Sequence, residues 1–129
     1  MRDQPVATLD HLLGSQRKAR LVGGPPDRLN VVARLKGGDG PALAFLAHTS
    51  TGRADPEECT RDPWSGDLVD GEIWGRGALD MKDQVAASAV AFASLWREGF
   101  VPAGDLILVL TADEEVNEDY GLSWLVKEH

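Results

Sequence analysis

The chain has 129 residues, of which 43% are hydrophobic and 26% are charged, and this suits one soluble globular domain with a modest core. Its net charge of -8 argues against nucleic acid as a partner, because binding to phosphates needs clustered lysines and arginines. The single cysteine excludes an intrachain disulfide. The sequence has no secretory leader and no apolar run of membrane-spanning length, so it predicts a cytoplasmic protein without a membrane partner.

The first half of the chain predicts one short helix followed by strands. The helical pattern covers residues 9–19 and is interrupted by Gly14. Short strands, apolar and closed by glycine or by a polar residue, are predicted at 19–24, 29–37 and 42–48. Because the last two are joined by the Gly-rich turn GGDGP, the sequence predicts that they pair as a hairpin within a larger sheet.

The second half predicts a long loop, a helix, a strand and the beginning of another helix, which is the order of an α/β fold. Residues 49–80 are rich in Gly, Pro and Asp without a sustained period, as in functional loops, and a small hairpin is predicted at Asp70–Gly71. A continuous apolar strand that ends in acids covers 104–115. The helix over 83–99 is predicted from an apolar stripe at helical spacing, formed by Val85, Ala89, Phe92 and Trp96.

Residues that can bind metal gather where the predicted strands end. His48 ends one strand, the run Asp113, Glu114 and Glu115 ends another, and Asp80 precedes the long helix. In open α/β sheets this edge is where ligands bind. Each has a structural alternative: a hydrogen-bonded strand end for His48, a helix cap for Asp80, and a solvated turn for the glutamates. However, carboxylates beside a buried strand are costly unless a cation or proton compensates, and imidazole with carboxylates is a donor set for zinc.

Two segments, DPWSGDLVDGEIWGRGALDMKD and TADEE, resemble a known family of zinc-dependent metallopeptidases. The family includes aminoacylase, succinyl-diaminopimelate desuccinylase, acetylornithine deacetylase and the glutamate carboxypeptidases, and the resemblance runs from about Arg20 to His129. It implies an α/β catalytic domain of three layers, with a mixed sheet between helices. It also implies an amidohydrolase that cleaves N-acyl amino acids or small peptides with two Zn²⁺ ions, Co²⁺ or Mn²⁺ being alternative ions.

The resemblance assigns roles by position in these motifs. His48 matches the first zinc ligand, Asp80 the aspartate that bridges both metals, and Glu115 the ligand of the second metal. Glu114 matches the general base that takes a proton from the attacking water. Ser50 stands where the family has an aspartate that hydrogen-bonds and orients the histidine ligand. Loss of such a partner is expected to cost about 10–100-fold in affinity or activity.

The resemblance further implies two later metal ligands and an inserted lid and dimerisation domain, which this chain does not contain. Residues 1–129 are therefore expected to be a partial catalytic domain, an amino-terminal fragment with little catalysis by itself. Such a fragment would expose a sheet edge that is open to self-association.

Two alternatives from other classes stay open. One is a non-catalytic, degenerate fragment or paralogue that acts at most as a binding or structural module, which Ser50 favours. The other is a flavodoxin-like nucleotide-binding module. Its support is thin, because neither GGPPDR nor KGGDG is a phosphate loop followed by a helix.

Overall fold

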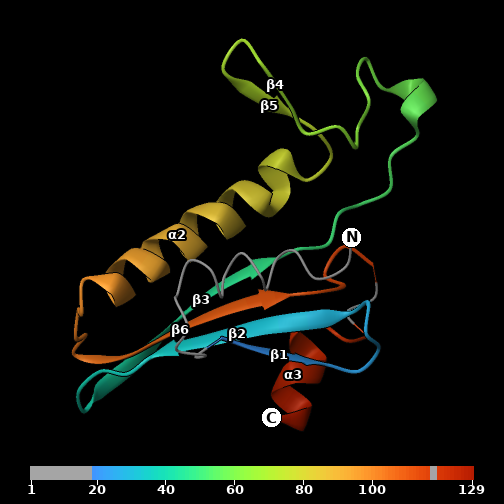
Figure 1. The fold of residues 1–129 in the computed structure, drawn as a ribbon. Coiled ribbons are helices and arrows are strands. Elements are labelled where there is room, and N and C mark those ends of the chain that lie inside the picture. Colours follow the sequence, from blue (N-terminus) through green and yellow to red (C-terminus); the bar gives the residue numbers. More distant parts are fainter. Residues whose placement is uncertain (1–18, 117–118) are drawn as a thin grey trace.

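The structure is a computed structural model that describes residues 19–116 and 119–129. Residues 9–18 of the helix predicted over 9–19 lie outside the described residues, and residue 19 begins a strand. In chain order the described elements are β1 (Ala19–Gly23), β2 (Leu29–Leu35), β3 (Gly40–His48), the short helix η1 (Pro56–Glu58), β4 (Asp67–Val69), β5 (Glu72–Trp74), the helices η2 (Ala78–Lys82) and α2 (Asp83–Arg97), β6 (Gly104–Thr111) and α3 (Leu122–Glu128), drawn in Figure 1.

The main sheet has the strand order β1-β2-β6-β3, in which β2 is antiparallel to β1 and β6 while β3 is parallel to β6. The predicted pairing of β2 with β3 is therefore wrong, because β6 lies between them. The Gly-rich segment makes room for the start of β6, since a Cβ on Gly37 or Gly104 would collide with the facing backbone. Its amides at Gly38 and Gly40 donate to the carbonyl oxygens of Pro102 and Ala103, each at 2.9 Å.

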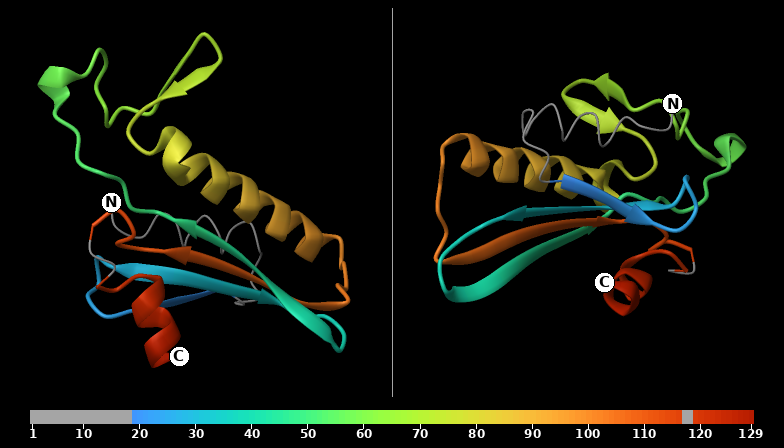
Figure 2. Two further views of the ribbon diagram at one scale, coloured as in Figure 1. Left: turned by 180° about the vertical axis from the view of Figure 1, so that it is seen from behind. Right: turned by 60° about the horizontal axis from the view of Figure 1, so that its bottom comes forward.

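Helix α2 covers one face of this sheet and α3 lies on the opposite side, as the two views of Figure 2 show. The arrangement confirms the predicted α/β fold with a mixed sheet between helices. No helix among the described residues combines the length and the apolar character needed to cross a bilayer. The core between α2 and the sheet consists of Val31, Ala33, Leu35, Ala47, Ala89, Phe92, Ala93, Leu108 and Leu110.

Strand β6 is the buried central strand that the sequence predicts, whereas β3 forms an edge of the described sheet. On β3 the apolar side chains of Leu43, Phe45 and Leu46 are 54%, 44% and 51% exposed. An exposed, apolar edge strand can template pairing with another chain. The exposed edge is thus present, and self-association through it stays a prediction.

The long loop between β3 and α2 extends beyond the end of the sheet (Figure 1). Strands β4 and β5 pair in it as the predicted hairpin, with positive φ angles of 52° at Asp70 and 86° at Gly71. Two consecutive positive φ angles match the turn that joins two-residue hairpins. The loop returns through η2 directly into α2, which places Asp80 close to the end of β3.

Candidate metal centre

His48 and the acidic turn meet because β3 and β6 run parallel and end together. In the register of these strands His48 pairs with Thr111, the last residue of β6. The amide of Thr49 donates to the carbonyl oxygen of Thr111 at 2.8 Å, which carries the pairing one residue further. The chain that leaves β6 therefore passes beside His48 and brings Glu114 and Glu115 to it.

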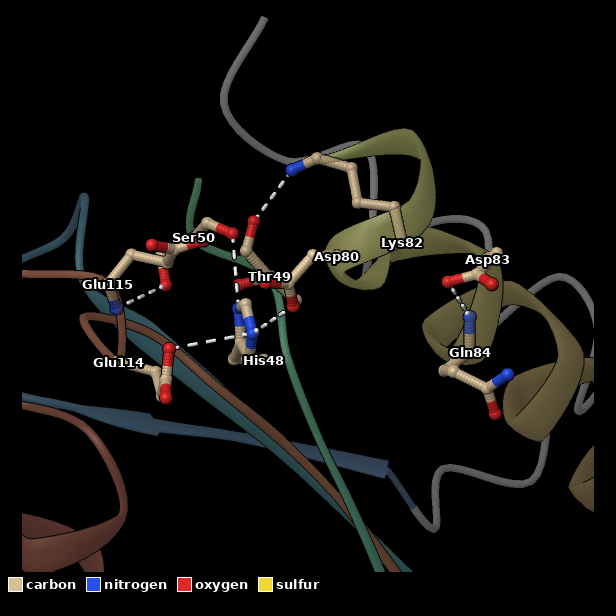
Figure 3. Close-up of polar contacts among 9 residues, drawn as sticks. All are labelled: His48, Thr49, Ser50, Asp80, Lys82, Asp83, Gln84, Glu114 and Glu115. Carbon is tan, nitrogen blue, oxygen red and sulfur yellow. Dashed lines mark hydrogen bonds and ion pairs between the residues drawn. The ribbon is translucent and has the colours of Figure 1, made fainter. Parts of the chain in front are cut away.

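The imidazole of His48 is buried and has oxygen atoms on both sides (Figure 3). Its Nδ1 lies 3.2 Å from the carbonyl oxygen of Ser50, which can only accept, so this contact places a proton on Nδ1. Its Nε2 lies 3.2 Å from Asp80 Oδ1 and 3.5 Å from Glu114 Oε2. A neutral imidazole with its proton on Nδ1 presents a lone pair at Nε2. The two carboxylates then face that lone pair unless a cation lies between them.

Glu115 joins this arrangement to form a cluster of donor atoms. One ligand atom each from His48, Glu114 and Glu115 lies within 4.8 Å of the others. The side chains of Asp80 and Glu114 are 78% and 50% exposed, so the cluster is open to solvent. Imidazole nitrogen and carboxylate oxygen are donors that zinc accepts. The residues present therefore fit a divalent cation.

The charges around the cluster also favour a cation. Within the described residues, the carboxylates of Asp80, Glu114 and Glu115 have no lysine or arginine at ion-pair distance. Lys82 is close in sequence, but its Nζ donates to the carbonyl oxygen of Thr49 at 2.7 Å, and burial lowers its pKa. Three carboxylates thus meet a single imidazole. Like charges at this spacing repel unless an ion from solution neutralises them.

Ser50 makes a contact that the sequence comparison did not reveal. The family's aspartate would accept from the histidine, and here the main-chain carbonyl of Ser50 lies in hydrogen-bond reach of His48 Nδ1. Backbone carbonyls commonly orient metal-binding histidines in this way. The Ser50 hydroxyl is used elsewhere, because its Oγ accepts from the amide of Glu115 at 3.3 Å. Ser50 therefore touches two predicted ligands, with its carbonyl and its side chain.

Asp80 is not the cap of α2. Neither Gly77 nor Lys82, the residues that precede η2 and α2, makes a side-chain cap hydrogen bond. Asp80 itself has non-helical angles (φ -127°, ψ 93°) within η2, and the peptide bond from Asp80 to Met81 is cis. Its carboxylate faces His48 instead of the helix amides. The structural alternative for Asp80 as a helix cap is therefore wrong.

A cavity of about 600 Å³ opens beside Asp80 and Glu115, and the long loop forms its wall. The guanidinium of Arg61 lies over the ring of Trp74 in this wall, 4.8 Å from the ring centre. The loop that the sequence marks as functional thus borders the predicted ligands.

Sequence reasoning missed the residues that lie beneath the glutamates. Arg28 forms an ion pair with the buried carboxylate of Asp113, and Asn30 is fully buried. One signal was available: Asn30 is a polar residue between the apolar residues Leu29 and Val31 of a strand. Two of its three partners lie 82 and 90 residues away in the chain, which no local pattern reveals.

The fold and the donor cluster together are those of a metal-binding α/β domain, because the mixed sheet brings these donors to one edge. Residues 44–129 match Peptidase family M20/M25/M40, and the chain belongs to this family. The resemblance noted in the motifs is thereby confirmed. The family is one of metallopeptidases, which implies a divalent metal.

Relatives of known structure or name agree with this assignment. The chain is 44% identical over 87 residues to a succinyl-diaminopimelate desuccinylase of Rhodospirillum centenum, a match that covers 67% of this chain and 22% of that protein. Human carnosine dipeptidase 1 shares the fold with a TM-score of 0.68 and 23% identity, over 95% of this chain and 28% of its own. An M20 family metallo-carboxypeptidase from Sulfolobus solfataricus gives a TM-score of 0.68 and 26% identity, over 84% and 24%. The chain therefore spans about a quarter of the length of these proteins.

Proposed function

We propose that this chain supplies part of the active site of a dinuclear zinc amidohydrolase that cleaves N-acyl amino acids or small peptides in the cytoplasm. The observation that supports it is the convergence of His48, Asp80, Glu114 and Glu115 from three separate segments. The relatives are named as a desuccinylase, a dipeptidase and a carboxypeptidase, and each of these reactions hydrolyses an amide bond.

In this proposal His48, Asp80 and Glu115 hold the metal, with Co²⁺ and Mn²⁺ as alternatives to Zn²⁺. The bound metal supplies Lewis-acid polarisation of the scissile carbonyl. Glu114, which is half exposed, takes the proton of the attacking water and passes it to the leaving amine as the C–N bond breaks. The carbonyl of Ser50 keeps the imidazole oriented by accepting the Nδ1 proton.

A second candidate is a module that binds metal without catalysis. Ser50 in place of the family's aspartate favours it, because a carboxylate raises the basicity of a ligating histidine more than a carbonyl does. In the first proposal residues 1–129 act as a partial catalytic domain, whereas in the second they keep the architecture of such a domain without its chemistry. The exposed apolar edge at β3 supports self-association of the isolated chain in both readings as well.

Calorimetric titration of Zn²⁺ into the metal-free chain tests the proposal, with Co²⁺ and Mn²⁺ titrated in parallel. We expect saturable binding of Zn²⁺ and slow hydrolysis of an N-succinyl amino acid, which Glu114→Gln lowers by at least about 100-fold, as loss of a general base does. Arg34→Gln, at the other end of the sheet, is the control for correct folding. Binding without hydrolysis supports the non-catalytic module, and absence of Zn²⁺ binding contradicts both candidates.

A further inference from the structure

The turn that carries the two glutamates begins in an unusual backbone conformation. Asp113, the residue before Glu114, has a positive φ of 64° and is 3% exposed. A residue other than glycine in the left-handed region costs free energy and persists only when its surroundings hold it there. Among the described residues of this short turn, one main-chain hydrogen bond lies within it, from the amide of Val116 to the carbonyl oxygen of Asp113 at 3.1 Å. The turn therefore needs support from elsewhere in the chain.

Arg28 provides the first support, from the connection between β1 and β2. Its guanidinium forms an ion pair with the carboxylate of Asp113, and this hydrogen bond raises the pKa of Arg28. The Asp113 side chain is 4% exposed, while that of Arg28 is 45% exposed. The buried carboxylate therefore depends on the more exposed guanidinium for compensation of its charge. Without Arg28 the carboxylate would be a buried charge without compensation, and the turn would have to move to hydrate it.

Asn30 provides the second support, from the second residue of β2, the strand that follows this connection. Its Oδ1 accepts from the amide of Ala112 at 2.9 Å, just before the turn. Its Nδ2 donates to the carbonyl oxygen of Tyr120 at 2.8 Å, after the turn, and to that of Val22 at 3.1 Å. One fully buried side chain thus holds both sides of the acidic turn and ties them to β1.

We propose that Arg28 and Asn30 are positioning residues, through which the β1–β2 hairpin sets the place of Glu114 and Glu115 beside His48. Neither residue touches the imidazole or the glutamate carboxylates in the described contacts. The hairpin acts through the backbone of the turn, which fixes the approach of Glu114 Oε2 to His48 Nε2 at 3.5 Å. The consequence of this support for metal affinity rests on the proposed function, whereas the effect of the hairpin on the turn does not.

The chain contains a matched control at the other end of the same two strands. Arg34 of β2 forms an ion pair with Asp105 of β6, and the two side chains are 53% and 10% exposed. This pair resembles Arg28–Asp113 in residue types and in its asymmetry of exposure, but it lies at the start of β6, away from the acidic turn. Arg34→Gln therefore removes a comparable ion pair without touching the turn.

Amide hydrogen exchange of the full, metal-free chain tests the proposal in Arg28→Gln and Arg34→Gln. We expect Arg28→Gln to speed exchange at the amides of Ala112 and Glu115 by at least about tenfold relative to Arg34→Gln, as loss of one charge-assisted hydrogen bond would. Arg28→Lys keeps the charge and should restore part of the protection. In Zn²⁺ titration, affinity should fall about 10–100-fold in Arg28→Gln and stay unchanged in Arg34→Gln.

Two results would overturn the proposal. One is equal exchange at Ala112 and Glu115 in both variants. The other is a uniform rise along the whole chain of Arg28→Gln, which would mean global destabilisation instead of a local effect on the turn. If the wild-type chain binds no Zn²⁺, the proposed function fails, but the exchange comparison still decides whether Arg28 holds the turn.

Discussion

The two ends of strands β2 and β6 carry the same pair of residue types with different outcomes. At the start of β6, Asp105 accepts from Arg34, from Lys36 Nζ at 3.3 Å and from the amide of Gly37 at 2.8 Å. Beyond the end of β6, Asp113 has Arg28, and the two glutamates that follow it have no lysine or arginine at ion-pair distance among the described residues.

The difference lies in where the compensating charge comes from. At the first end the chain supplies every donor, and the Gly37 amide together with Arg34 lowers the pKa of Asp105 to about 2. At the second end Asp80, Glu114 and Glu115 lie around one imidazole, and no lysine or arginine among the described residues pairs with them, which favours a cation from solution. The first arrangement satisfies its carboxylate within the chain, and the second is the place that we propose for a cation.

The largest expected effect comes from His48→Ala, which removes the only nitrogen donor of the described cluster. We expect Zn²⁺ affinity to fall by at least about 100-fold, because loss of a ligand exceeds the cost of losing an outer partner. His129→Ala is the matched control, since that histidine packs against Trp124 near the chain end, 5.6 Å between ring centres. If calorimetry gives equal Zn²⁺ affinities for the two variants, His48 is not a ligand of the metal.

Ser50→Asp increases the difference between the two ends of β2 and β6. It adds a fourth carboxylate near His48, where the other three have no lysine or arginine partner among the described residues. We expect Zn²⁺ affinity to rise about tenfold, since a carboxylate near Nδ1 raises the basicity of the imidazole. Ser50→Asn has a similar size without the charge and serves as the control. Equal affinities of the two variants in calorimetry would mean that the Ser50 carbonyl already meets the need of the histidine.

The sequence predicts the convergence of donors because the features that cause it are local. The apolar runs end at His48 and before Asp113, and parallel strands bring their carboxyl ends to one edge. The strand order could not be predicted from local sequence. The Gly-rich segment is compatible with a tight hairpin between β2 and β3 and equally with the close approach of Gly104. The contact of the Ser50 carbonyl was equally hidden, since a main-chain oxygen is present whichever side chain stands there.

The roles proposed for Arg28 and Asn30 could not be predicted from the sequence either, because they depend on contacts between distant segments. Asn30 lies in a segment that the sequence predicts as an ordinary strand and Arg28 directly precedes it, and the roles proposed for them depend on partners more than 80 residues away. A buried asparagine that bonds three backbone groups cannot be distinguished from an exposed one until the sheet is assembled. The donors of the site are therefore readable in the sequence, whereas the residues that hold them are not.

The smallest expected effect concerns the compensated end and its dependence on pH. Because the pKa of Asp105 in the folded chain, about 2, lies below the ordinary value of about 4, its contribution is present above pH 4 and is lost as the pH falls toward 2. Denaturant unfolding at pH 7, 4 and 2 should find wild type more stable than Asp105→Asn at pH 7, with the difference in the free energy of unfolding shrinking toward pH 2.

The control is Asp39→Asn, which changes an exposed aspartate of the adjoining turn and should follow wild type throughout. A constant gap between wild type and Asp105→Asn across this range would show that the charge of Asp105 does not stabilise the fold, and the contrast between the two ends would then rest on the metal cluster alone.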